Sequence, residues 1–307
     1  MVYCSKQFFA IFARSNKQFM HSFKTQIKMK NRLLTLKTIV ITLALLTISC
    51  NSKVHNETLT EENYLHEDSL LWMSFEKETE ALVAILDSLP NQRDSIINVY
   101  NSLNEKANQK NIELAFKYAC TPSGLRRLFM VRNYVSKDSL AKVLNTLPEE
   151  MQKSETGLNI KAHLETEQLA EGNALFSFPC QNEEGEPFDW ETLKGKQVLL
   201  LYGGLGCMGS NGREALKNLY EQTSRKNLEI IVYWPSSSLE NLQAIRKQYP
   251  SDYIFISDFK QDASPMKIKY GCQATPTCFL TDKNHLIVVK SEGLDIDEFN
   301  EHLDVQK

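Results

Sequence analysis

Two apolar runs constrain the fold of this chain more than any other feature of its sequence. They are Gln197–Tyr202 and Leu228–Trp234, and a segment with a helical pattern, Ser210–Arg225, separates them. A strand that is apolar along its whole length has to be covered on both faces, which is typical of central strands in α/β sheets. The two runs therefore predict a pair of core strands that a helix connects.

The same alternation continues to the end of the chain. A hairpin-like entry at Phe176–Pro179 and Gly185–Trp190 precedes the first core strand, and further helices and strands follow the second. The sequence therefore predicts an α/β domain over residues 170–307, with helices on both faces of its sheet. The later elements that we expect are a helix at Ser238–Gln248, a strand at Tyr253–Ile256, a helix at Ala263–Lys269, a strand at His285–Lys290 and a helix from Asp295.

Residues 63–165 have a different pattern, in which apolar side chains recur at intervals of three and four residues. Short breaks at Pro90, Pro122 and Pro148 divide this region. Such spacing predicts a small all-α domain. The helical runs begin near Tyr64 and continue through Ile96–Leu103, Ile112–Ala119, Leu125–Tyr134 and Ser139–Leu147. Cys120 lies among them, and we expect it to be a buried small side chain.

The first 62 residues have the composition of a targeting segment and a tether. Basic residues precede the apolar run Thr38–Ser49, which is 12 residues long and too short to span a bilayer. With Cys50 behind it, this segment resembles the lipobox of bacterial lipoproteins, so we expect a signal peptide at 29–49, a lipid on Cys50 and a linker at 50–62. Residues 1–28 are expected to be an over-extended reading frame. The alternative is an ordinary signal peptide followed by a chance cysteine.

Charge and cysteine content exclude several classes of function. Residues 1–49 hold eight of the 35 basic side chains and none of the 38 acidic ones, so the rest of the chain has a net charge of −11. That charge disfavours a nucleic-acid partner. The cysteines form no C-x2-C pair and the six His residues have no i, i+4 spacing, so no metal site and no cofactor are expected.

Three segments in the α/β region resemble a known family. They are Gly185–Trp190 with Leu193–Lys196, Cys207 shortly after the first core strand, and Tyr270–Leu280. Together they resemble the thioredoxin-like superfamily, in particular the exported TlpA/ResA and AhpC/TSA-type redoxins of lipoproteins from Bacteroides-like bacteria. The resemblance implies a thioredoxin-like domain, a cis Thr275–Pro276 bond packed beside Cys207, and thiol chemistry at Cys207.

The redox motif departs from the family pattern W-C-x-x-C. The segment here is Gly206-Cys207-Met208-Gly209-Ser210, so Ser210 replaces the resolving cysteine. A hydroxyl cannot resolve a mixed disulfide as a thiolate does. Cys207 still precedes a predicted helix, whose N-terminus favours a thiolate. Cys272 and Cys278 are possible resolving thiols, and the alternative is that both are buried core residues.

The sequence leaves three functions open. The first is an envelope-tethered thiol-disulfide oxidoreductase or isomerase in which Cys207 forms mixed disulfides with protein substrates, assisted by Thr275 and Pro276. Its partners would be protein thiols or disulfides of the envelope and, through the lipid anchor, a membrane. The second is a degenerate thioredoxin fold that serves as a binding module. The third is a one-cysteine thiol peroxidase, although Leu200 and Gly203 stand where that family has Pro and Thr.

Overall fold

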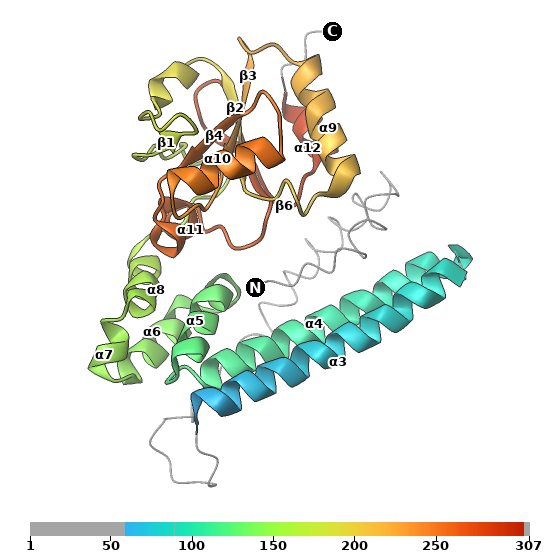
Figure 1. Cartoon of the computed structure of the whole chain (residues 1–307), viewed down its shortest axis with the longest axis vertical. Helices are drawn as coiled ribbons and strands as arrows, with labels where there is room; N and C mark the ends of the chain where they lie inside the picture. Colours follow the sequence, from blue (N-terminus) through green and yellow to red (C-terminus); the bar gives the residue numbers. More distant parts are fainter. Residues whose placement is uncertain (1–58, 89, 304–307) are drawn as a thin grey trace. The chain divides into compact units, whose positions relative to one another are not determined.

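The computed structural model describes residues 59–88 and 90–303, which divide into two compact units at Thr166. The predicted leader, the Cys50 lipidation site and most of the predicted linker lie outside the described residues. The first unit contains only helices, and the second contains a sheet with helices (Figure 1). This mixed architecture confirms the predicted fold class.

The helical unit begins with a long antiparallel hairpin of α3 and α4, which pack along each other (Figure 1). The two runs expected at Ile96–Leu103 and Ile112–Ala119 are one continuous helix, α4, because no proline or glycine interrupts the sequence between them. The helices are α3 Glu61–Ser88, α4 Arg93–Lys117, α5 Pro122–Val131, α6 Lys137–Thr146, α7 Glu149–Gln152 and α8 Glu155–Glu165, with 3-10 turns η1 Pro90–Gln92 and η2 Arg132–Tyr134.

Side-chain caps and ion pairs fix these helices. Thr121 caps α5 by accepting from the Gly124 N–H, with Pro122 in the first turn, where its missing N–H has no consequence. Arg127 of α5 then binds both carboxylate oxygens of Asp68 at 2.9 Å. These contacts join the start of the hairpin to α5.

The second unit has a six-stranded sheet in the order β1-β4-β3-β2-β5-β6. Strands β2, β3 and β4 are parallel, whereas β5 runs antiparallel to both of its neighbours, β2 and β6. Every residue of β2 and of β3 is buried, as their composition predicts. The strands are β1 Gln181–Asn182, β2 Gln197–Tyr202, β3 Leu228–Tyr233, β4 Ile254–Ser257, β5 Thr277–Thr281 and β6 Ile287–Glu292.

Helices and one long segment cover the two faces of this sheet. One face packs against α9 Gly209–Gln222, α10 Leu239–Gln248 and α12 Ile296–His302 through Leu216, Leu242 and Phe299. The other packs against α11 Pro265–Ile268 and parts of the segment 169–193, which contains the short strand β1 and ends in the 3-10 turn η3 Trp190–Leu193. Both faces of the central strands are therefore shielded from water.

Two local predictions were wrong. Phe176–Pro179 forms no strand, because side chains take up its backbone hydrogen bonds. The Tyr270 hydroxyl accepts from the N–H of Phe176 and donates to its C=O, and the Trp190 indole donates to the Phe178 carbonyl. The helix expected at Ala263–Lys269 is split into η4 Gln261–Ala263 and α11. Ser264 between them is extended because it precedes Pro265.

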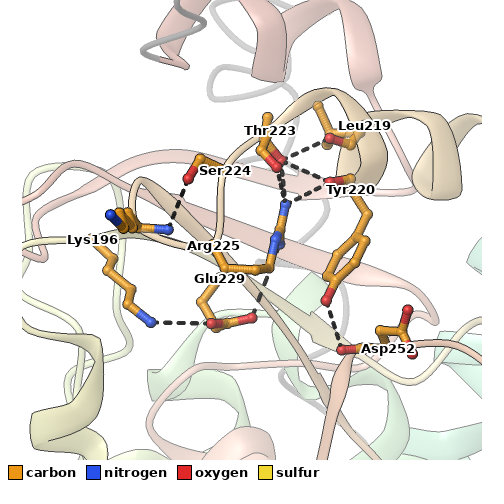
Figure 2. Close-up of polar contacts among 9 residues, drawn as sticks. Lys196, Leu219, Tyr220, Thr223, Ser224, Arg225, Glu229 and Asp252 are labelled. Atoms are coloured by element: carbon orange, nitrogen blue, oxygen red, sulfur yellow. Dashed lines mark hydrogen bonds and ion pairs between the residues drawn. The ribbon is translucent and has the colours of Figure 1, made fainter.

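A polar cluster lies at the amino-terminal end of β3, as Figure 2 shows. Glu229 is 7% exposed and binds Lys196 at 3.2 Å, with Arg225 at 4.0 Å. The Arg225 guanidinium also lies over the Tyr220 ring at 3.6 Å and donates to the Tyr220 carbonyl. The two cations compensate the charge of the buried carboxylate, so the cluster has a structural role at this end of the sheet.

Candidate functional site

The loop after β2 presents Cys207 at the opposite, carboxyl end of the sheet. Leu205 and Met208 on either side of the cysteine are 2% and 5% exposed and insert into the core. Gly206 between them is exposed, and Cys207 is partly exposed. The two buried anchors therefore leave the Cys207 thiol as the reactive group that this loop offers to solvent.

Helix α9 begins two residues after Cys207. No side chain caps its N-terminus, so the first N–H groups are directed at the loop. Arg213 of α9 donates to the Leu205 carbonyl at 3.0 Å and holds the loop against the helix. Ser210 is exposed in the first turn and its hydroxyl lies 3.5 Å from the Asn211 carboxamide oxygen. The start of α9 therefore lies directly beside the loop that carries Cys207.

The segment before β5 lies against this loop. The Thr275–Pro276 peptide bond is cis. The Thr275 hydroxyl is 3.6 Å from the Cys207 sulfur, although the two residues are 68 positions apart in the chain. Pro276 is buried, Thr275 is exposed, and the Pro276 carbonyl accepts from the Gly293 N–H at 2.8 Å. The structure thus places the exposed residue Thr275 beside the Cys207 thiol.

The other cysteines of the α/β unit lie in its core. Cys272 and Cys278 are fully buried and pack in the clusters on opposite faces of the sheet. Burial raises the pKa of the Cys278 thiol, and it raises the pKa of Cys180 to about 12. None of the five described cysteines forms a disulfide. Cys120 is partly exposed, contrary to expectation, but it belongs to the helical unit.

Two aromatic residues at the site had no signal in the sequence. Tyr249 follows α10, and its hydroxyl lies 2.7 Å from the position that a Cβ of Gly206 would occupy. Its ring centroid is 6.1 Å from that of Trp234 and 5.9 Å from the Arg213 guanidinium. An aromatic residue at the end of an amphipathic helix usually belongs to the hydrophobic core, so the sequence gives no reason to assign it to a site. Only the fold reveals that Tyr249 lies beside the Cys207 loop.

Two further properties bear on the chemistry. Among residues 59–88 and 90–303, no group of His, Cys, Asp or Glu side chains is arranged to hold a metal ion. The helices in these ranges include none that is both long and apolar enough to cross a membrane.

Comparison with protein-family models and with curated proteins finds no match. Solved structures do match, and the three that follow each cover less than half of this chain. A thiol-disulfide oxidoreductase from Bacteroides fragilis is 19% identical over 44% of this chain and 100% of its own, with a TM-score of 0.37. The thioredoxin domain of a thiol-disulfide oxidoreductase from Bacteroides vulgatus is 20% identical over 45% of this chain and 100% of its own, with a TM-score of 0.38. A thiol peroxidase from Chromobacterium violaceum is 15% identical over 45% and 87% respectively, with a TM-score of 0.36.

Proposed function

We propose that this chain is a thiol-disulfide exchange protein in which Cys207 forms mixed disulfides with protein substrates. The observation that carries the proposal is the partly exposed Cys207 sulfur at 3.6 Å from Thr275, beside Pro276. In the same unit, the other three thiols are buried. A substrate segment that lies along Thr275 would bring its disulfide within reach of Cys207.

The exchange step needs only groups that the site and the substrate supply. The Cys207 thiolate attacks one sulfur of a substrate disulfide, so a bond forms between the two sulfurs and the substrate S–S bond breaks. The second substrate sulfur leaves as a thiolate and takes up a proton from water.

Release of the substrate distinguishes this chain from a dithiol reductase. Ser210 offers a hydroxyl where a second thiol would attack, and Cys272 and Cys278 are enclosed in the core. The resolving group therefore comes from the substrate. The freed thiolate attacks another disulfide of the substrate, and the thiolate released by that step attacks the substrate sulfur of the mixed disulfide, so that a new substrate S–S bond forms and Cys207 leaves as a thiolate. The net result is disulfide isomerisation, which consumes no external oxidant or reductant.

We further propose that this exchange takes place in the cell envelope, with the chain tethered through a lipid on Cys50. The proposal is supported by the basic and apolar pattern of residues 29–49. Metabolic labelling with a fatty acid should label the wild type but not Cys50→Ala. An unlabelled wild type would refute the tether and would leave the exchange chemistry unaffected.

Trapping of a disulfide-bonded substrate protein tests the chemistry. Wild type should accumulate a mixed disulfide that non-reducing electrophoresis detects, and Cys207→Ser should accumulate none. Cys120→Ala is the matched control, because among the described residues it removes the other partly exposed thiol and should leave trapping unchanged.

A variant that restores the second thiol of the motif provides a further test. Ser210→Cys should convert trapping into release of the reduced substrate, because the second thiolate in the first turn of α9 attacks the mixed disulfide and forms a disulfide with Cys207. An added dithiol such as dithiothreitol then reduces this disulfide and gives turnover. A folded wild type whose Cys207 does not react with alkylating reagents at neutral pH would refute the exchange function and favour the binding module.

A further inference from the structure

The hydroxyl of Tyr249 lies against the backbone of Gly206, the residue directly before Cys207. A Cβ at Gly206 would be 2.7 Å from this oxygen, which is closer than a Cβ approaches a non-bonded oxygen. The backbone itself does not require glycine here, because the φ of Gly206 is outside the left-handed region. The phenolic oxygen of Tyr249 is therefore the group that keeps a side chain from this position.

The same hydroxyl still has a proton to donate. It accepts a hydrogen bond from the Gln248 carboxamide at 3.3 Å, and this contact lies at the surface. A phenolic hydroxyl can also donate one hydrogen bond. Among residues 59–88 and 90–303, none accepts a hydrogen bond from Tyr249. The donor is therefore available to a molecule that binds beside Gly206, which is itself exposed.

Contacts on the ring of Tyr249 hold its hydroxyl in this position. The ring packs between the Trp234 indole and the Arg213 guanidinium, at centroid distances of 6.1 and 5.9 Å. The Tyr249 N–H donates to the Ile245 carbonyl at 2.9 Å, which joins the residue to the end of α10. A side chain that is already fixed loses little conformational entropy when it binds a ligand. The hydroxyl is thus a pre-positioned donor at the Cys207 loop.

The hydroxyl is also within reach of a substrate that is bonded to Cys207. Because it contacts Gly206, its oxygen is at most about 8 Å from the Cys207 Cα. A disulfide separates the two Cα atoms that it joins by about 4–7 Å. These distances allow the hydroxyl to bond the main chain next to the substrate cysteine, where a carbonyl is present whatever the substrate sequence.

We propose that Tyr249 is a substrate-binding residue, whose hydroxyl donates to a main-chain carbonyl beside the substrate cysteine that Cys207 attacks. The proposal rests on the exchange function of Cys207. It makes the contribution of Tyr249 specific to peptide and protein disulfides, because a small disulfide without a carbonyl offers the hydroxyl no such acceptor.

The test compares two disulfides that Cys207 would attack. One is a short capped peptide whose single cysteine is a pyridyl disulfide, and the other is ethyl pyridyl disulfide, which has no carbonyl group. Release of the pyridyl thiol measures the rate, and Cys207→Ser gives the background from the other thiols. Tyr249→Phe should slow the reaction with the peptide about fivefold, which is about the effect of one hydrogen bond, and should leave the reaction with the ethyl reagent unchanged.

Gly206→Ala tests the same contact from the other side. The new Cβ would displace the hydroxyl, so this variant should also slow the peptide about fivefold and leave the ethyl reagent unaffected. In the Tyr249→Phe background, Gly206→Ala should have no further effect, because the Cζ of the ring would then lie 3.7 Å from the Cβ, an ordinary contact distance. The effects of the two substitutions on the peptide rate are therefore expected to be non-additive.

Two further variants serve as controls. Tyr220→Phe removes a hydroxyl that donates to the Asp252 carbonyl at 3.0 Å, and it should change neither rate. Ala244→Trp places an indole in the lining of a surface cavity of about 300 Å³, which Trp234 and Ile245 also line, and it should preserve both rates. If Ala244→Trp slows the peptide and Tyr249→Phe does not, the substrate binds in the cavity and the proposed hydrogen bond is wrong.

The ethyl reagent separates the two possible failures. If it does not modify Cys207, the exchange function is wrong and the role of Tyr249 falls with it. If it reacts, but Tyr249→Phe slows neither reagent or slows both equally, the role of Tyr249 alone is wrong. Additive effects of Gly206→Ala and Tyr249→Phe would likewise refute that role.

Discussion

At the scale of single residues, Gly204 determines how closely the Thr275–Pro276 segment can approach the Cys207 loop. Its φ is +88°, which side chains rarely tolerate, and a Cβ there would lie 2.4 Å from the Pro276 nitrogen. Both the backbone conformation and the available space therefore require glycine. The contact between Cys207 and Thr275 depends on this absence of a side chain.

We predict that Gly204→Ala lowers the free energy of unfolding by about 2–4 kcal/mol, because strain at positive φ adds to the collision with Pro276. It should also slow disulfide exchange at Cys207, because Thr275 is displaced. Urea unfolding and the rate of reaction with a small disulfide measure the two effects. The matched control is Gly209→Ala, since Gly209 has a φ of +68° but no atom within 4 Å of its Cβ position, and about 1 kcal/mol is expected. Equal effects of the two substitutions would contradict this account.

His163 of the helical unit makes stability depend on pH. Burial lowers the pKa of its imidazole to about 4, with the charges of Arg132 and Lys137 acting in the same direction. The unfolded chain therefore binds a proton between about pH 6.5 and pH 4 that the folded chain does not bind, so stability falls as pH falls through this range.

We expect the helical unit to lose up to about 3 kcal/mol of stability between about pH 7.5 and pH 4 from this one group. Thermal unfolding across that range measures the loss, and His163→Gln should flatten it. A His163→Gln variant with the same pH dependence as the wild type would show that another group is responsible.

At the scale of elements, strand β3 has a different role at each end. Its carboxyl end leads into Trp234 and the cavity, whereas its amino end holds the buried Glu229 between Lys196 and Arg225 (Figure 2). The two cations come from the turn before β2 and from the connection after α9. The cluster therefore ties these two connections to the amino end of β3.

We predict that Glu229→Gln lowers the free energy of unfolding of the α/β unit by about 1–3 kcal/mol, because it leaves two half-buried cations without their carboxylate. Exchange at Cys207 should be unchanged in the folded fraction. Glu221→Gln is the matched control, since it removes the carboxylate from the exposed pair with Lys217 and should change stability by at most about 0.5 kcal/mol. Chemical denaturation measures both variants, and a Glu229→Gln variant as stable as the wild type would refute the role of the cluster.

At the scale of the whole molecule, the chemistry belongs to one unit. The α/β unit has its own core on each face of the sheet, and Cys207, Thr275, Tyr249 and the cavity all lie within it. Its first segment also packs inside the unit, since Lys269 donates to the Glu167 carbonyl at 2.8 Å. A fragment that begins at Thr166 therefore retains the complete core and site.

We predict that residues 166–307 fold without the helical unit and unfold cooperatively. Cys207 should react with a small disulfide at the rate found in the full chain. Calorimetry and the exchange rate test this expectation. An aggregated or non-cooperative fragment would show that the helical unit is needed for folding, and a folded fragment with an altered rate would show that this unit acts on the site.

The sequence by itself determined the features that depend on local composition. Apolar runs such as Gln197–Tyr202 specify central strands, because an apolar strand has no stable position at a surface. Breaks at Pro90, Pro122 and Pro148 divide the helical region for an equally local reason, the missing N–H of proline. The segment around Thr275–Pro276 was identifiable because its motif is short and contiguous.

Only the tertiary structure decided which distant residues meet. It brings Thr275 to Cys207 and Tyr249 to Gly206, and it places Cys272 and Cys278 on opposite faces of the sheet. It also replaces the expected strand at Phe176–Pro179 with hydrogen bonds from Tyr270 and Trp190. These outcomes depend on strand order and on which face each side chain occupies, and both are settled by packing over the whole unit.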